Sequence, residues 1–175
     1  LLCGAFQVYA ATGTIDPLNY TAQVCESQAC DITGTSSVNF GVFGTASASN
    51  VTVTDTELTG FIWGQSFGWA VLNCANVVAP GGGAGGGCTS TNGNFKVANT
   101  TSGHLSGYAW GEDAGWINFG PFINNGAAPV VINSLGEFNG YAWSQNYGWI
   151  KFDCSLTDYC VKTDWRPSVT YQCSD

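Results

Sequence analysis

The sequence predicts an all-β, antiparallel domain of the β-sandwich type, built from about three copies of a tryptophan hairpin and held by disulfides. Three observations predict this fold. Stretches of Val, Ile, Thr and aromatic residues alternate with polar residues, as half-buried strands do. A Trp- and Gly-rich phrase occurs three times. The chain also lacks the sustained i, i+3, i+4, i+7 apolar pattern of a helix.

The first element expected is a strand in the N-terminal stretch LLCGAFQVYAATGTI, where one face carries Leu2, Phe6, Val8 and Ala10. Two roles stay open for this strand. It either joins the sheet of its own domain or is donated to a neighbouring subunit, where main-chain hydrogen bonds to a sheet edge supply affinity. We therefore divide the chain into an N-terminal strand segment, residues 1–37, and a repeat-built domain with a cysteine-rich end, residues 38–175.

The three Trp phrases follow, each preceded by a further alternating stretch, so that each copy reads as strand–turn–strand–turn–strand. We expect about ten to thirteen short strands in all. Five residues separate the two tryptophans of a copy, and a five-residue hairpin loop would place them face to face, as cross-strand staples of the core. Gly115 then supplies a positive φ. The pairs are Trp63 with Trp69, Trp110 with Trp116, and Trp143 with Trp149.

The spacing of the copies bears on the architecture. Gly60, Gly107 and Gly140 begin the copies, so the spacings are 47 and then 33 residues. Three copies suggest a pseudo-threefold β-trefoil, and a barrel is a further alternative, but the unequal spacing favours a sandwich. VNFGVF at 38–43 matches INFGPF at 117–122 in four positions and indicates a degenerate fourth copy.

Eight cysteines, one histidine and no C-x-x-C pair favour disulfides over zinc. Disulfides persist in oxidising compartments, so we expect an exported protein. Cys74 and Cys88 flank a Gly-rich stretch, and their bridge would close a loop with a stabilisation of roughly 3 kcal/mol. Cys25–Cys30 and Cys154–Cys160 are local options, while Cys3–Cys173 or an intermolecular bond from Cys3 stays open. The cysteines are Cys3, Cys25, Cys30, Cys74, Cys88, Cys154, Cys160 and Cys173.

The net charge of −8 bears on the partners of the protein. Its basic residues, Lys96, Lys151, Lys162 and Arg166, are scattered, which argues against nucleic acid and against anionic lipid. No run reaches the ~18 apolar residues of a membrane span. The chain begins at Leu1 without Met, and we expect a mature product at the cell surface or outside the cell, with its leader removed.

The candidates for chemistry are few, and we expect no enzyme and no cofactor. His104 is the only histidine and reads as a turn residue, and no catalytic motif surrounds a serine. Glu112 and Asp113 are replaced by neutral residues in the other two copies. The carboxylates lack calcium-loop spacing, which leaves structural calcium as a weak option. Three sequons, at Asn19, Asn50 and Asn99, are candidate glycosylation sites.

The phrases GYAWGEDAGWINFG and NGYAWSQNYGWIKF resemble the G-Y-A-W-x-x-x-x-G-W-I-x-F repeats of secreted or surface proteins in bacteria, which are largely uncharacterised. The resemblance covers 59–73, 105–122 and 139–153, and it implies a surface location but no activity. In the first copy, Phe61-Ile62 and Ala70 depart from the pattern.

These observations lead us to expect a structural subunit of an extracellular filament or surface layer. Copies would join head to tail through the N-terminal strand or through exposed sheet edges, an arrangement that does not close. The alternative is a carbohydrate-binding or adhesion module that uses exposed aromatic residues and binds glycans. A hydrolase built on Glu112 or Asp113 comes third.

Overall fold

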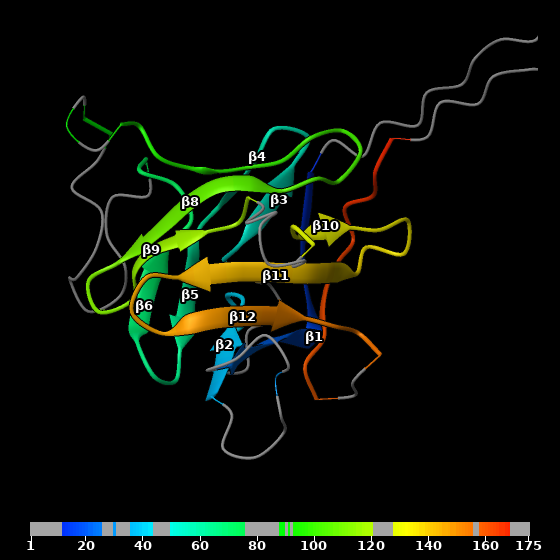
Figure 1. Cartoon of the computed structure of the whole chain (residues 1–175). Helices are drawn as coiled ribbons and strands as arrows, with labels where there is room; N and C mark the ends of the chain where they lie inside the picture. Colours follow the sequence, from blue (N-terminus) through cyan, green and yellow to red (C-terminus); the bar gives the residue numbers. More distant parts are fainter. Residues whose placement is uncertain are drawn as a thin grey trace, which may run out of the picture.

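The computed structural model describes residues 12–25, 30, 36–43, 50–75, 88–89, 91, 93–120, 128–155 and 158–168. Within these residues the chain forms thirteen strands and no helix (Figure 1). The strands are β1 (Thr12–Cys25), β2 (Ser36–Asn39), β3 (Thr52–Thr54), β4 (Glu57–Thr59), β5 (Phe61–Gly64), β6 (Gly68–Val71), β7 (Val97–Ala98), β8 (Ser106–Gly111), β9 (Gly115–Asn118), β10 (Val131–Ile132), β11 (Phe138–Ser144), β12 (Gly148–Phe152) and β13 (Val161–Thr163).

Eight of the strands close into an antiparallel barrel. Going round it, the order is β1, β2, β5, β6, β8, β9, β11 and β12, and β12 pairs with β1 again. The all-β, antiparallel, disulfide-stapled fold is therefore confirmed, and its architecture is the barrel named as an alternative rather than the sandwich. Closure leaves no strand of this ring with a free edge.

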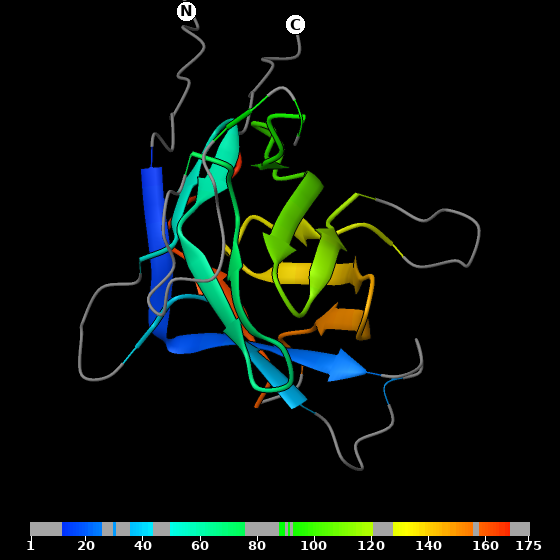
Figure 2. The same ribbon diagram turned by 90° about the vertical axis from the view of Figure 1, so that its left-hand side faces the viewer.

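The other five strands extend the barrel at one end. β1 is long and bends (Figure 2). Its last residues pair with β2 and β12, whereas Thr12–Thr14 pair with β3, and the register shifts between Ile15 and Tyr20, where β1 meets β13. β3, β4 and β7 then lead to the start of β8, and β10 pairs with the start of β11.

The barrel consists of four hairpins with the same inward-facing pair. Ile62 faces Ala70, Ala109 faces Ile117 and Ala142 faces Ile150 across the three Trp hairpins. In the hairpin of β1 and β2, Ala22 faces Val38 at the same place. All eight side chains are buried. The fourth copy suggested by VNFGVF thus occupies the position of the second strand in its hairpin.

A second inward-facing layer is aromatic. Phe40, Phe119 and Phe152 occupy the same position at the end of the second strand of their hairpins, two residues beyond the inward-facing Val38, Ile117 and Ile150, and each is buried. The ring centroids of Phe40 and Phe152 lie 5.2 Å apart, and Phe138 lies within 6.0 Å of both. Burial of each such ring stabilises the fold by roughly 1.5–3 kcal/mol. The sequence motif is repeated because each hairpin contributes residues to this core.

The predicted tryptophan pairing is confirmed in all three copies. Trp63 lies opposite Trp69, Trp110 opposite Trp116, and Trp143 opposite Trp149. The ladder continues one residue beyond the tryptophans, to Gly111 and Gly115, so the loop is shorter than the five residues expected. Gly115 has a φ of +66°, as predicted, and reverses the chain where a residue with a Cβ would be strained.

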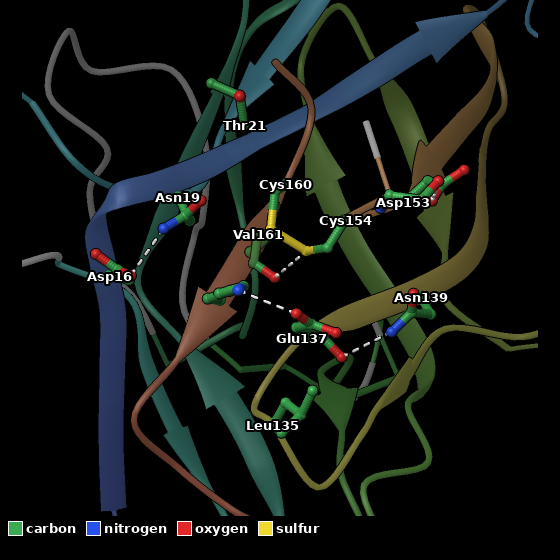
Figure 3. Close-up of a disulfide and its surroundings, with 12 residues drawn as sticks. Asp16, Asn19, Thr21, Leu135, Glu137, Asn139, Asp153, Cys154, Cys160 and Val161 are labelled. Atoms are coloured by element: carbon green, nitrogen blue, oxygen red, sulfur yellow. Dashed lines mark hydrogen bonds and ion pairs between the residues drawn. A yellow bond between two sulfur atoms is a disulfide. The ribbon is translucent and has the colours of Figure 1, made fainter. Parts of the chain in front are cut away.

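Three disulfides join described residues: Cys25–Cys30, Cys74–Cys88 and Cys154–Cys160. The predicted Cys74–Cys88 bridge is confirmed, and both local options are formed. The Cys154–Cys160 bridge lies beside β13, where Lys162 forms an ion pair of 3.0 Å with Glu137 (Figure 3). Cys3 and Cys173 lie outside the described residues.

The expected N-terminal strand falls partly on described residues. Leu2, Phe6, Val8 and Ala10 lie outside them, so their predicted role in assembly stays a prediction. β1 and the first half of β2 fall within residues 1–37 and belong to the barrel of their own chain. In the described part of the chain there is no helix long and apolar enough to cross a membrane.

Candidate aromatic groove

A groove of about 620 Å³ lies on the outer wall of the barrel, between the second and third Trp hairpins. Its volume falls in the range of ~300–1,000 Å³ found for small-molecule sites. Four of its seven lining residues are aromatic and two are amides. The lining residues are Gly93, Phe95, Tyr108, Trp116, Asn118, Trp143 and Gln145.

Strand alternation turns these side chains outward. Because Ala109 and Ile117 face the core, the residues on either side of them in β8 and β9 face solvent. Tyr108 lies opposite Asn118 on β9, and Asn118 lies opposite Trp143 on β11. Three adjacent strands thus present Tyr108, Asn118 and Trp143 side by side in one row.

The aromatic rings meet at steep angles. The Trp116 ring lies 5.2 Å from the Phe95 ring at an interplanar angle of 81°, and 5.9 Å from the Tyr108 ring at 75°. Its cross-strand partner Trp110 packs against it at 4.8 Å. Trp116 is therefore held by neighbours on several sides in a cluster of edge-to-face rings.

Phe95 reaches the groove from a segment that is anchored to the barrel. Its carbonyl oxygen accepts a hydrogen bond of 3.0 Å from the backbone N–H of Cys74, and its side chain is buried in a cluster with Val71 and Cys74. Cys74 in turn is bonded to Cys88. The disulfide therefore braces the segment that forms one wall of the groove.

The tips of the second and third hairpins are tied together at one end of the groove. The backbone N–H of Gln145 donates to the carbonyl oxygen of Trp116 at 2.9 Å. The Ser144 hydroxyl, which is buried, donates to the carbonyl oxygen of Ala114 at 2.8 Å, and the Asn146 amide donates to that of Asp113 at 2.7 Å. These bonds fix the position of Gln145 relative to Trp116.

Several polar groups in the lining have no hydrogen-bond partner among the described residues. Asn118 accepts a bond from the backbone N–H of Gly120 at 2.7 Å, but its amide nitrogen makes no hydrogen bond to any described residue. The amide nitrogen of Gln145 and the hydroxyl of Tyr108 likewise make no hydrogen bond to any described residue. None of the described lining residues is charged. The groove thus combines apolar faces with uncharged donors and acceptors.

The six paired tryptophans differ in their surroundings, and of these only Trp116 and Trp143 line the groove. Trp149 is buried against Cys25 and Cys30. Trp69 packs against Phe43 with ring centroids 4.8 Å apart, while Trp63 is 38% exposed on the wall outside the groove. The two tryptophans thus pair across the strands in every copy, as expected. In the second and third copies one of them also lines the groove.

The other residues considered as candidates for chemistry lie outside the groove. Glu112 and Asp113 are exposed at the tip of the second hairpin and do not line the groove. His104 is exposed and forms an isolated bridge with Val131. No group of three metal-ligating side chains occurs among the residues that the structure describes.

All three sequon asparagines make hydrogen bonds within the fold. Asn99 is only 6% exposed; its amide donates to the carbonyl oxygen of Thr54 at 2.7 Å and accepts from Thr100. Asn50 accepts a bond of 2.7 Å from the backbone N–H of Phe61. The Asn19 amide donates to Asp16 at 2.9 Å (Figure 3). The amide nitrogen of Asn99, the atom that would carry a glycan, is thus engaged in a hydrogen bond inside the fold.

Sequence reasoning missed Phe95, Tyr108, Asn118 and Gln145 as lining residues. Asn118 carried a weak signal. It is an uncharged amide at a position where the first and third copies have Val71 and Lys151. Phe95 carried none, since it lies outside the repeated phrase. No protein-family model, curated protein or solved structure matches the chain.

Proposed function

We propose that this protein is an extracellular adhesion module that binds carbohydrate in the aromatic groove. The observation that carries the proposal is the row Tyr108–Asn118–Trp143, backed by Trp116 and Phe95, in a groove of about 620 Å³. Sugar rings have apolar C–H faces that pack on aromatic rings, and hydroxyls that pair with amides. The groove offers both kinds of partner.

Several features support binding rather than catalysis. Hydrolysis of a glycosidic bond requires two carboxyl groups facing one another across the substrate. The part of the lining that the structure describes carries none, and Glu112 and Asp113 are adjacent residues on a hairpin tip. The disulfides support an oxidising, extracellular compartment. Hydrogen bonds between the hairpin tips hold the groove in place before any ligand arrives, which reduces the entropic cost of binding.

An array of immobilised glycans probed with the purified native protein tests the proposal. The affinity of the best glycan is then measured by calorimetry for the wild type, Tyr108→Ala and Trp143→Ala. Tyr108 is 45% exposed, so its truncation leaves the fold intact. We expect each change to weaken binding at least about fivefold, since interface aromatics typically contribute more than 1 kcal/mol.

Trp63→Ala is the matched control, because Trp63 occupies the position of Trp143 in another copy but lies outside the groove. Its affinity should equal that of the wild type. Absence of binding to every glycan, or an equal loss in the control, would overturn the proposal.

The filament or surface-layer subunit is the second candidate. It is favoured by two exposed apolar side chains, Leu18 at 86% and Leu135 at 64%, since exposed apolar surface is typical of contact sites. Pro17, next to Leu18, lines one hollow with Leu135. The closed ring offers no free edge, so assembly would rest on these side chains, on the strands outside the ring or on residues 1–11.

Electron microscopy of the native material tests this second candidate. Fibres that disappear in the double variant Leu18→Ser/Leu135→Ser, or on deletion of residues 1–11, would support it. Discrete particles at all concentrations would contradict it and leave the groove proposal unaffected.

A further inference from the structure

We propose that the groove selects glycans with free, protonated amines, such as hexosamine units without an N-acetyl group, over neutral and acidic glycans. This inference rests on the proposed carbohydrate binding and specifies the ligand class of the same site. Ring geometry, the placement of the basic residues and the overall charge each contribute to it.

The aromatic lining of the groove favours a cation. The faces of aromatic rings carry negative electrostatic potential, and an ammonium group within about 6 Å of a ring centroid is attracted to it. Phe95 and Tyr108 stand nearly perpendicular to Trp116, at 81° and 75°. These edge-to-face contacts fix the rings in place, and Tyr108, which is 45% exposed, supplies ring surface that an ammonium group in the groove can contact.

Among the described residues, no positively charged side chain lines the groove. The four basic residues lie outside the lining, and each has a partner. Lys96 pairs with Glu57 at 3.4 Å, Lys151 with Asp153 at 3.1 Å and Lys162 with Glu137 at 3.0 Å. The Arg166 guanidinium donates to the carbonyl oxygens of Thr163 and Trp165.

The overall charge supports a cationic ligand. The chain has a net charge of −8, and such a field attracts cations and repels anions. Glu112 and Asp113 add to it near the groove, because the Asn146 bond to the carbonyl oxygen of Asp113 holds their tip beside Gln145. Neither carboxylate forms an ion pair with a described residue.

The uncharged lining points to an amine carried by a sugar rather than by an isolated alkyl chain. Asn118, Gln145 and the Tyr108 hydroxyl offer hydrogen bonds to hydroxyl groups that surround the amine on a pyranose ring. An N-acetyl group would replace the ammonium by a neutral amide and so remove the attraction to the rings.

The test compares two ligands of equal length, a glucosamine tetramer and an N-acetylglucosamine tetramer, by calorimetry in a mildly acidic buffer. We expect the native protein to bind the amine tetramer roughly tenfold more tightly, with a preference that decreases as salt is added. Equal affinities, or tighter binding of the acetylated tetramer, would overturn the inference and leave carbohydrate binding standing. Failure of both ligands, together with an empty glycan array, would overturn both.

Two variants separate the groove from non-specific attraction to an acidic protein. Tyr108→Leu keeps the net charge and an apolar side chain but removes a ring, and we expect the amine preference to fall about threefold. Glu112→Gln/Asp113→Asn should weaken binding of the amine tetramer and leave that of the acetylated tetramer unchanged. Survival of the full preference in Tyr108→Leu and Trp116→Phe/Trp143→Leu would contradict selection by the rings.

Discussion

The backbone N–H of Gln145 donates a hydrogen bond of 2.9 Å to the carbonyl oxygen of Trp116. These residues belong to different hairpins, and their bond joins the two walls of the aromatic groove. The side-chain oxygen of Gln145 also lies 3.5 Å from the backbone nitrogen of Trp116. The groove is therefore formed between two copies of the repeat, and its shape depends on how the hairpin tips meet.

Ser144→Ala tests the contribution of the tip contact to stability. The Ser144 hydroxyl is fully buried and bonds to the Ala114 carbonyl oxygen, which would be left without this partner. We expect the free energy of unfolding, measured by urea titration, to fall by about 1–3 kcal/mol. Ser106→Ala, on an exposed strand position, should change it by less than about 0.5 kcal/mol. A similar small change in both variants would contradict this role.

Gly115→Ala and Gly68→Ala form a matched pair. Both glycines have positive φ, +66° and +68°, so both substitutions strain the backbone by roughly 1–2 kcal/mol. A Cβ at Gly68 meets open space, whereas one at Gly115 lies 3.0 Å from the side-chain oxygen of Gln145. We expect Gly115→Ala alone to weaken glycan binding, because it displaces Gln145. Equal affinities of the two variants would contradict the account.

Removal of the Cys74–Cys88 bridge should affect both stability and binding. Cys74→Ala/Cys88→Ala is expected to lower the free energy of unfolding by about 3 kcal/mol, since the bridge closes a long loop. It should also weaken binding, because the bridge fixes the segment of Cys74, whose side chain packs in one cluster with Phe95. Cys154→Ala/Cys160→Ala is the control, and it should reduce stability without changing affinity. An unchanged affinity in the first variant would show that the bridge does not brace the groove.

The pair of Glu137 and Lys162 predicts a dependence of stability on pH. A hydrogen bond from Asn133, followed by the interaction with Lys162, holds the pKa of Glu137 below its ordinary value of 4.5. The folded state therefore stays deprotonated to lower pH than the unfolded state, and the stabilisation is complete above pH 4.5 and lost as the pH falls through the folded pKa. The difference in unfolding free energy between wild type and Glu137→Gln should shrink over that range. A constant difference would contradict this.

The sequence predicted the features that depend on neighbouring residues. Trp110 faces Trp116 and Gly115 reverses the chain because hairpin geometry is local, and Cys74 pairs with Cys88 across a single loop. The choice between sandwich and barrel depends instead on β12 pairing with β1, which joins Cys25 to Trp149 in register. Nothing near either residue in the chain specifies that contact.

The unequal spacing of the copies has a simple structural origin. The two spacings differ by 14 residues, which is also the separation of Cys74 and Cys88. The disulfide closes an insertion between the first two copies, so the uneven spacing is compatible with regularly arranged hairpins. The groove could not be predicted from the sequence either. Asn118 contacts Trp143 only because β9 of one copy pairs with β11 of the next.

The most direct test of carbohydrate binding in the groove is an NMR titration of the tryptophan indole N–H signals with the preferred glycan. The chain has seven tryptophans, so each signal can be assigned by single substitutions. We predict that the signals of Trp116 and Trp143 shift with ligand, while those of Trp63 and the buried Trp165 stay in place. Shifts confined to Trp63 and Trp69, or no shift at saturating ligand, would contradict the account.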